Sequence, residues 1–170
     1  MQDQDIYFMG EAIKEARKAE KLDEVPIGAV VVFRGEIIAR AYNTVETKNL
    51  ATSHAEINAI IKASEYLESW RLLGCTLYVT LEPCLMCLGA IIKSRIPRLV
   101  FGAYDKNSGY VISNGNILEN IRDHKFTFEG GIEERECQTL LRDFFKKLRD
   151  RRENECDWNS KWNFIKRNKI

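Results

Sequence analysis

The sequence predicts a three-layer α/β/α fold, in which helices cover both faces of a five-stranded mixed sheet. Three observations predict it: an early strand hairpin, a later alternation of strand and helix patterns, and a length of 170 residues, which suits one domain with its own core. The chain is 45% hydrophobic and 30% charged, as ordinary globular proteins are, and its sequence contains no internal repeat.

The first half of the chain predicts a helix, a strand hairpin and a second helix. An apolar run over 27–33 indicates a buried strand, the Arg34-Gly35 turn follows it, and a second strand returns over 36–42. A polar loop then leads to a helix from about His54 to Leu67. Before the hairpin, apolar residues recur at helical spacing at Ile6, Met9, Ile13 and Ala16.

The second half of the chain alternates strands with helices. One helix runs from Cys84 to about Lys93 with Pro83 in its first turn, where proline is well tolerated, and a long amphipathic helix follows Gly130-Gly131. Because helices connect the last three strands, these strands should be parallel, whereas the hairpin is antiparallel. The three strands are expected at 75–81, 98–103 and 126–128.

Composition argues against several classes of protein. No segment has the apolar length of a membrane span, and the acidic start of the chain lacks the features of a secretion signal. We therefore expect a cytoplasmic protein without a membrane partner. In that reducing compartment the five cysteines favour metal binding or catalysis over disulfides.

Charge is unevenly spread, although the formal net charge is only +1. Residues 141–170 hold ten Lys or Arg against five Asp or Glu, so the rest of the chain is mildly acidic. We expect a main domain over 1–150 and a basic extension over 151–170, where the spacing of Trp158, Trp162 and Ile165 predicts a short helix. The basic tail either reaches phosphate groups of a partner or is a solvated helix face.

Three residues have the types and spacing of metal ligands. Cys84 and Cys87 are three apart at a helix start, so they share one face, and the helix dipole there favours thiolates. A Cys-x-x-Cys pair alone is equally typical of a redox pair or of half a structural zinc site. His54 also begins a helix, and His124 is the other histidine. One histidine and two cysteines with a fourth position open are typical of catalytic zinc.

Glu56 adds a carboxylate two residues after His54. One interpretation is structural, because Ser53 at the helix N-cap and Glu56 three residues later would form a capping box. The other is chemical. Zinc lowers the pKa of bound water to about 7, and a carboxylate can carry protons from that water to a ring nitrogen and to leaving ammonia. Both helix starts should lie at the carboxyl edge of the sheet, where ligands bind.

His-x-Glu together with Pro-Cys-x-x-Cys is the signature of the zinc deaminases. Further motifs accompany it, namely 25–30, Asn43, 54–56, 77–84, 87–90, 94–98, 101–103 and the pair Phe144-Phe145. With them the sequence resembles the tRNA-specific adenosine deaminases of the cytidine deaminase-like superfamily, over about Ile6 to Leu148. The resemblance makes 1–150 a cytidine deaminase-like catalytic domain.

This resemblance implies a homodimer that acts on the anticodon arm of an arginine tRNA and converts its wobble adenosine to inosine. It implies one Zn²⁺ per subunit, held by His54, Cys84 and Cys87, with Glu56 transferring protons. It implies substrate contacts at Asn43, Ala55, Pro83 and Asp105. By sequence alone, Asn43 is equally a turn residue after a strand, and Asp105 equally caps its own loop.

Three segments depart from the family pattern, one of them the tail beyond Asp150, which is longer than the family needs, and two other functions fit the same residues. Ala51-Thr52-Ser53 replaces the family's Pro-Thr-Ala, and the loop over 106–114 is bulkier than usual. One alternative is a free nucleobase deaminase such as guanine deaminase, which uses the same zinc chemistry; the block 94–103 argues against it. The other is a non-catalytic, zinc-stabilised RNA-binding or scaffold subunit, which would have no use for Glu56.

Overall fold

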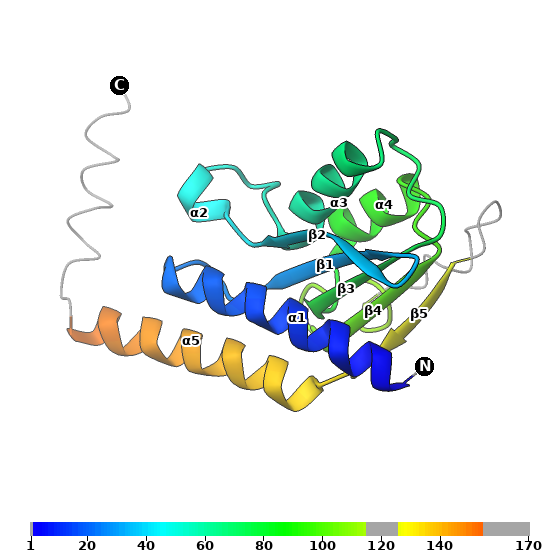
Figure 1. The fold of residues 1–170 in the computed structure, drawn as a ribbon. Coiled ribbons are helices and arrows are strands. Elements are labelled where there is room, and N and C mark those ends of the chain that lie inside the picture. The colour runs from blue at the N-terminus through cyan, green and yellow to red at the C-terminus, as the bar shows by residue number, and fades with distance from the viewer. Residues whose placement is uncertain (1, 115–125, 155–170) are drawn as a thin grey trace, which may run out of the picture.

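Five strands form one sheet in the computed structural model, which describes residues 2–114 and 126–154 (Figure 1). The strand order is β2-β1-β3-β4-β5; β1 pairs antiparallel with β2 and β3, and the pairs β3–β4 and β4–β5 are parallel. The predicted mixed sheet is therefore confirmed. The strands are β1 Gly28–Phe33, β2 Glu36–Tyr42, β3 Cys75–Leu81, β4 Arg98–Ala103 and β5 Thr127–Gly130.

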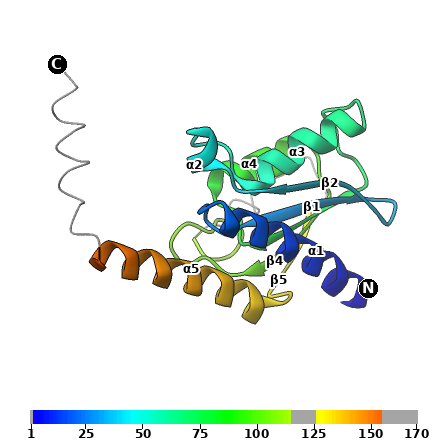
Figure 2. The same cartoon turned by 60° about the vertical axis from the view of Figure 1, so that its left-hand side comes forward.

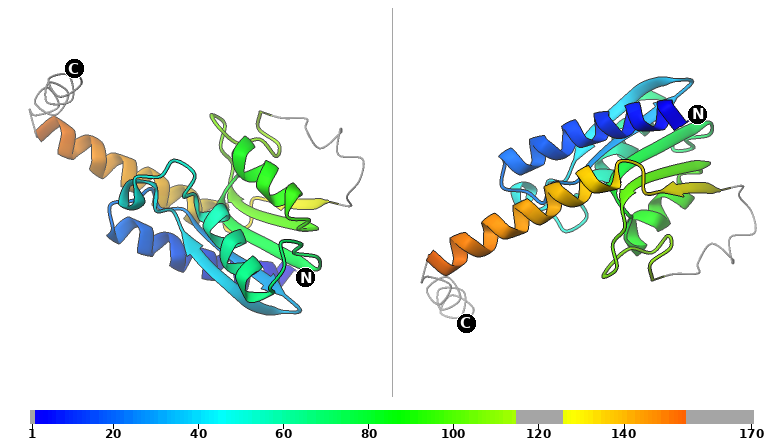
Figure 3. Two further views of the ribbon diagram at one scale, coloured as in Figure 1. Left: turned by 90° about the horizontal axis from the view of Figure 1, so that it is seen from above. Right: turned by 90° about the horizontal axis from the view of Figure 1, so that it is seen from below.

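Helices cover both faces of this sheet, as predicted. Helices α1 (Gln2–Lys21) and α5 (Glu134–Asn154) cross one face, and α3 (Ala55–Tyr66) and α4 (Leu85–Lys93) cover the other (Figures 2 and 3). Each layer has its own apolar core. Met9 and Val100 are fully buried on the α1 side, whereas Ala59 and Ile91 are fully buried on the α3 and α4 side.

Helix α1 lies very close to β1, and a glycine makes this approach feasible. A Cβ atom on Gly28 would lie 2.1 Å from the carbonyl oxygen of Ala12 and 2.3 Å from the backbone nitrogen of Ala16. Any larger residue would push the helix away from the sheet. The packing of α1 thus fixes the start of β1, which borders the site described below.

A buried polar network fastens the start of α1 to the sheet. Asp5 accepts hydrogen bonds from the Tyr78 hydroxyl at 2.7 Å and from both terminal nitrogens of Arg98 at 2.7 and 2.9 Å. Burial acts to raise the pKa of Asp5, but the bonds from Arg98 and Tyr78 outweigh it and hold that pKa below its usual value. The network therefore contains an ionised carboxylate whose charge is matched.

Three local expectations differ from the structure. A short helix, α2 (Val45–Lys48), interrupts the predicted polar loop. His54, and not Ser53, is the N-cap of α3. Pro83 precedes Cys84, which is the N-cap of α4, so the proline lies before the first helical turn and not within it.

The C-terminal helix runs without a break from Glu134 to Asn154, across the domain boundary expected at residue 150. The short helix expected around Trp158, Trp162 and Ile165 lies outside the described residues, so that division of the chain stays a prediction. Within the described part of the chain, no helix is both long enough and apolar enough to cross a membrane.

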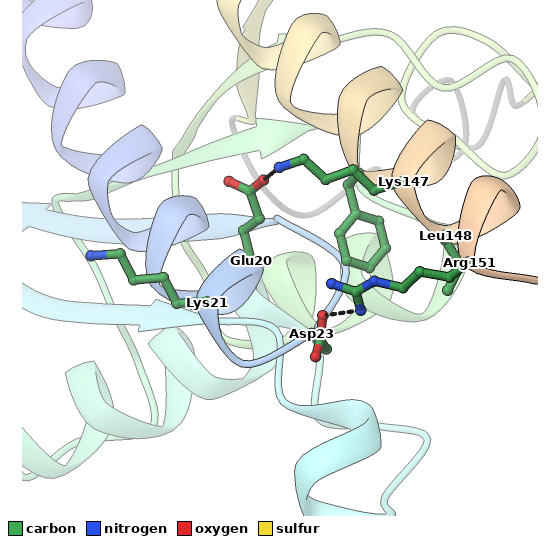
Figure 4. Close-up of a pocket in the computed structure, with 7 residues that line it drawn as sticks. Glu20, Lys21, Asp23, Lys147, Leu148 and Arg151 are labelled. Atoms are coloured by element: carbon green, nitrogen blue, oxygen red, sulfur yellow. Dashed lines mark hydrogen bonds and ion pairs between the residues drawn. The ribbon is translucent and has the colours of Figure 1, made fainter. Parts of the chain in front are cut away.

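A hollow of about 360 Å³ lies between the ends of α1 and α5 (Figure 4). Ion pairs join its two sides: Lys147 lies 2.7 Å from Glu20, and Arg151 lies 2.8 Å from Asp23. Phe144 of α5 also lines this hollow.

Candidate active site

A second cavity, of about 300 Å³, lies at the carboxyl edge of the parallel strands. It collects residues from the starts of α3 and α4, from the ends of β2 and β3, and from the loop after β4. This is the edge where ligands bind in sheets of this type. Its lining residues are Val25, Ile27, Asn43, Val45, Glu46, His54, Glu56, Leu81, Glu82, Cys84, Asp105 and Ser108.

The three predicted metal ligands meet beside this cavity. The Nδ1 atom of His54 lies 3.8 Å from the sulfur of Cys84 and 3.5 Å from the sulfur of Cys87. The ligand atoms of all three residues lie within 4.8 Å of one another. His124 lies outside the described residues. The structure therefore brings the predicted trio together, and the nearby imidazole favours a metal site over a redox pair.

Local backbone geometry leaves these side chains free to bind an ion. His54 and Cys84 occupy the N-cap positions of α3 and α4 in an extended conformation, and neither makes the side-chain capping bond usual at that position. Cys87 is one turn further into α4 and is fully buried. The helix starts thus place an imidazole and two sulfurs at one point.

Within the trio Cys84 carries the negative charge, and a metal bound to all three groups would displace the protons held by Cys87 and His54. Hydrogen bonds from Cys87 and then His54 lower the pKa of Cys84 to about 4, so this sulfur is a thiolate at neutral pH. The pKa of Cys87 is raised, chiefly because its thiol donates to Cys84. The pKa of His54 is raised by its hydrogen bond with Cys84. A set of one nitrogen and two sulfurs is typical of zinc.

Glu56 is a buried carboxylate with 4% of its surface exposed, and it lines the cavity. Burial raises its pKa. The capping-box interpretation is wrong, because His54 is the N-cap, so Glu56 is one position too early in α3 to complete such a box. Its carboxylate is therefore not engaged in that cap.

The predicted substrate contacts differ in position. Asn43 and Asp105 line the cavity, whereas Ala55 and Pro83 are buried and are not among its lining residues. Asp105 also caps its own loop, since its Oδ1 accepts hydrogen bonds from the backbone nitrogens of Asn107 at 2.9 Å and Ser108 at 3.1 Å. Both interpretations of Asp105 thus hold in its geometry, and its contact with substrate stays a prediction.

Sequence reasoning gave no structural role to Glu82, which organises the loop after β4. Its carboxylate is 2% exposed and accepts hydrogen bonds from four backbone nitrogens and one hydroxyl. Gly109 is required beside it, because a Cβ atom there would lie 2.5 Å from the carboxyl carbon. The donors are the backbone nitrogens of Asp105, Val111, Ile112 and Ser113 and the Ser113 hydroxyl.

Two large residues of the loop over 106–114 pack inward, away from the cavity. Val111 is buried, and Tyr110 packs with it against the core on the α3 and α4 side. Neither residue lines the cavity. The loop is nevertheless largely exposed, with Ile112 46% exposed, and its Ser108 lines the cavity.

Comparison with known proteins agrees with this geometry. A family model described as MafB19-like deaminase matches residues 2–149. The tRNA-specific adenosine deaminase of Bacillus subtilis (strain 168) is 49% identical over 150 residues, which cover 88% of this chain and 93% of that protein.

Two solved structures share the fold. One, from biochemical and structural studies of A-to-I editing by tRNA:A34 deaminases at the wobble position of transfer RNA, is 43% identical with a TM-score of 0.73 and covers 79% of this chain and 99% of that chain. A guanine deaminase from Nitrosomonas europaea is 26% identical, also with a TM-score of 0.73, over 82% of this chain and 83% of that chain. By its extensive identity to a curated relative, the chain belongs to the tRNA-specific adenosine deaminase family.

Proposed function

We propose that this protein is a zinc-dependent hydrolase that converts the wobble adenosine of a tRNA anticodon to inosine and releases ammonia. One observation carries the chemistry: an imidazole, two sulfurs and a buried carboxylate converge on a single cavity. The substrate is inferred from the relatives, which are named for tRNA-specific adenosine deamination. Arginine tRNA, the substrate expected from the sequence, belongs to the same proposal.

The metal fits the residues that are present. His54, Cys84 and Cys87 would hold one Zn²⁺ per subunit, and three protein ligands are the number typical of a catalytic site. When bound, zinc supplies a Lewis acid that lowers the pKa of water to about 7.

Glu56 would carry the protons of the reaction. Hydrolysis adds the oxygen of water to the ring carbon that bears the amine, and the bond from that carbon to the exocyclic nitrogen then breaks. Glu56 would take one proton from water and pass it to the neighbouring ring nitrogen, and would then take the remaining proton of the added hydroxyl and deliver it to the departing amine, which leaves as ammonia. Its burial favours the first of these steps, because burial raises the pKa of the carboxyl group and so strengthens its hold on a proton.

The remaining cavity walls would hold the base. Adenosine must leave the base stack to enter such a cavity, so a loop such as the anticodon is a better substrate than a duplex. Asn43 and Asp105 line this cavity and are the side chains we propose to contact the nucleotide. Ala55 and Pro83 adjoin His54 and Cys84 in the chain, which supports contacts through their backbone.

A homodimer is part of the same proposal. Large apolar side chains are exposed at the start of α4 and on α3: Leu85 is 49% exposed and Ile61 is 51% exposed. Exposed apolar surface of this kind is typical of protein interfaces. Location in the cytoplasm also stays a prediction.

The proposal is tested by metal analysis and by ammonia release. We expect about one zinc per chain, and ammonia from an arginine-tRNA anticodon stem-loop with adenosine at the wobble position. The product should read as guanosine on sequencing. Free guanine and cytosine serve as rival substrates. Release from guanine alone would replace this proposal with guanine deamination, and a purified chain without tightly held zinc would contradict the metal centre.

A further inference from the structure

A second carboxylate, which the proposed chemistry does not use, lies behind the cavity wall. Glu24 is 0% exposed. Its oxygens accept hydrogen bonds from Nδ2 of Asn43 at 2.9 Å and from the backbone nitrogens of Glu46 at 3.2 Å and Thr47 at 2.5 Å. Among residues 2–114 and 126–154 no cation pairs with it. Since burying an unpaired carboxylate is costly, these three donors are what stabilise it.

Glu24 fixes the segment that follows β2. Thr44, the N-cap of α2, makes no side-chain capping bond. Glu24 instead accepts from the second and third residues of that helix, which are the usual donors to a cap. Val45 and Glu46 line the cavity, so this buried carboxylate holds one of its walls in place.

The carboxylate of Glu24 also fixes the orientation of the Asn43 side-chain amide. A carboxylate surrounded by N–H donors can only accept, so the NH₂ group of Asn43 must face Glu24. Within the described residues, the other amide atom of Asn43, Oδ1, accepts no hydrogen bond. Every fully buried polar side-chain atom in this part of the chain has a partner, so Oδ1 is not fully buried. Asn43 lines the cavity, so its Oδ1 is accessible from that side.

We propose that Glu24 is a positioning residue that locks the Asn43 amide in one orientation and thereby sets the hydrogen-bonding pattern that a bound base meets. This inference rests on the proposed function, in which Asn43 contacts the base. Without the carboxylate, both amide orientations become accessible, and the productive one is populated for only part of the time. Glu24 thus contributes to base recognition through Asn43 without touching the substrate.

A double-mutant cycle tests this inference on the full-length, zinc-loaded protein. The variants are Glu24→Gln, Asn43→Ala and the pair, and the measurement is kcat/KM on the anticodon stem-loop. We expect Glu24→Gln alone to lower kcat/KM about tenfold, the cost of one hydrogen-bonding arrangement. In the Asn43→Ala background the same change should cost clearly less, because only the contacts of Glu24 with α2 then remain to be weakened. Equal losses in both backgrounds would overturn the proposal.

Asp5→Asn is the matched control, because Asp5 is also a buried acid but lies in the network that fastens α1. It should lower the melting temperature and leave kcat/KM unchanged, which separates lost stability from lost positioning. An NMR readout does not depend on activity. The side-chain NH₂ signals of Asn43 should shift in Glu24→Gln and stay unchanged in Asp5→Asn. Unchanged Asn43 signals in Glu24→Gln would refute the lock, whereas an inactive wild type with the expected shift would refute only the proposed function.

Discussion

Two hollows of similar size differ in what their polar groups are free to do. The hollow between α1 and α5 measures about 360 Å³, and its charged groups form ion pairs in which at least one partner is exposed (Figure 4). The cavity beside His54 measures about 300 Å³, and its imidazole, sulfurs and carboxylate are at least half-buried and converge without a cation among the described residues. Size alone therefore does not mark a site; convergent groups with unused bonding capacity do.

The difference arises from where each hollow lies in the fold. The cavity lies where parallel strands end and two helices begin, so side chains from separate segments point to one place. The other hollow lies between the outer parts of two long helices, where Lys147 and Arg151 extend into solvent. Ion pairs of that kind typically contribute between 0 and about 1 kcal/mol.

The largest expected effect is a difference in kcat between the same substitution made at Glu56 and at Glu20, one carboxylate from each hollow. Glu56→Gln should keep zinc and the fold but lower kcat about a thousandfold, because an amide cannot carry the protons. Glu20→Gln, the same change in the α1–α5 hollow, should leave kcat within about twofold. The measurement is ammonia release from the stem-loop at saturating substrate. Substantial activity in Glu56→Gln would remove its proposed role and with it the contrast between the hollows.

A cysteine pair distinguishes metal binding from packing. Cys87→Ala should lose zinc and most activity, because two ligands do not hold the ion tightly. Cys75→Ala removes a sulfur that is equally buried but distant from the trio in the sheet. It should keep a full complement of zinc and lose only about 1 kcal/mol of unfolding free energy. Metal analysis and thermal unfolding of the two variants give the comparison. Full zinc content in Cys87→Ala would contradict ligation.

The sequence predicts the ligands better than it predicts what holds the cavity around them. Cys84 and Cys87 are near neighbours on one helix, and His54 starts another, so local spacing and strand order suffice to bring them together. Glu24 and Glu82 act on backbone nitrogens more than twenty residues away. No periodicity marks such contacts, because they depend on the way the loops fold back in three dimensions.

Local competition explains the smaller errors. Ser53 has the usual residue type for an N-cap, but His54 takes that position, and α2 forms because Glu24 accepts from its first-turn nitrogens. The capping box and the polar loop were reasonable expectations from residue type alone. The polar loop fails because Glu24, distant in the sequence, accepts from the backbone nitrogens of α2, and the capping box fails because α3 begins one residue later than Ser53 would place it.

The carboxylate of Asp5 combines features of both hollows. It is paired with a cation, Arg98, like the acids of the α1–α5 hollow, and it is buried like Glu56 in the cavity. Asp5→Asn should lower the free energy of unfolding by about 2 kcal/mol, the usual value of hydrogen bonds to a charged group. The folded pKa of Asp5 lies below its unfolded value. Its stabilisation is therefore present above the unfolded pKa and is lost as pH falls through the folded pKa.

Denaturant unfolding of wild type and Asp5→Asn across acidic pH measures this contribution. The two stability curves should be separated near neutral pH and converge at low pH. A constant separation would mean that Asp5 contributes by packing and not by its charge. In that case the Asp5 network would differ from the α1–α5 hollow by its burial alone, and the pairing of its charge would not matter.

The smallest expected effect belongs to the α1–α5 hollow itself. Lys147→Ala should change the free energy of unfolding by less than about 0.5 kcal/mol, because Lys147 is largely exposed and salt screens its pair with Glu20. Its kcat/KM on the stem-loop should also stay within about twofold at moderate salt. If RNA binding instead weakens severalfold, and its logarithmic salt dependence becomes shallower by about one unit, Lys147 contacts a phosphate. The two hollows would then lie along one RNA-binding surface. The α1–α5 hollow would contact the RNA backbone, and the cavity beside His54 would carry out the chemistry.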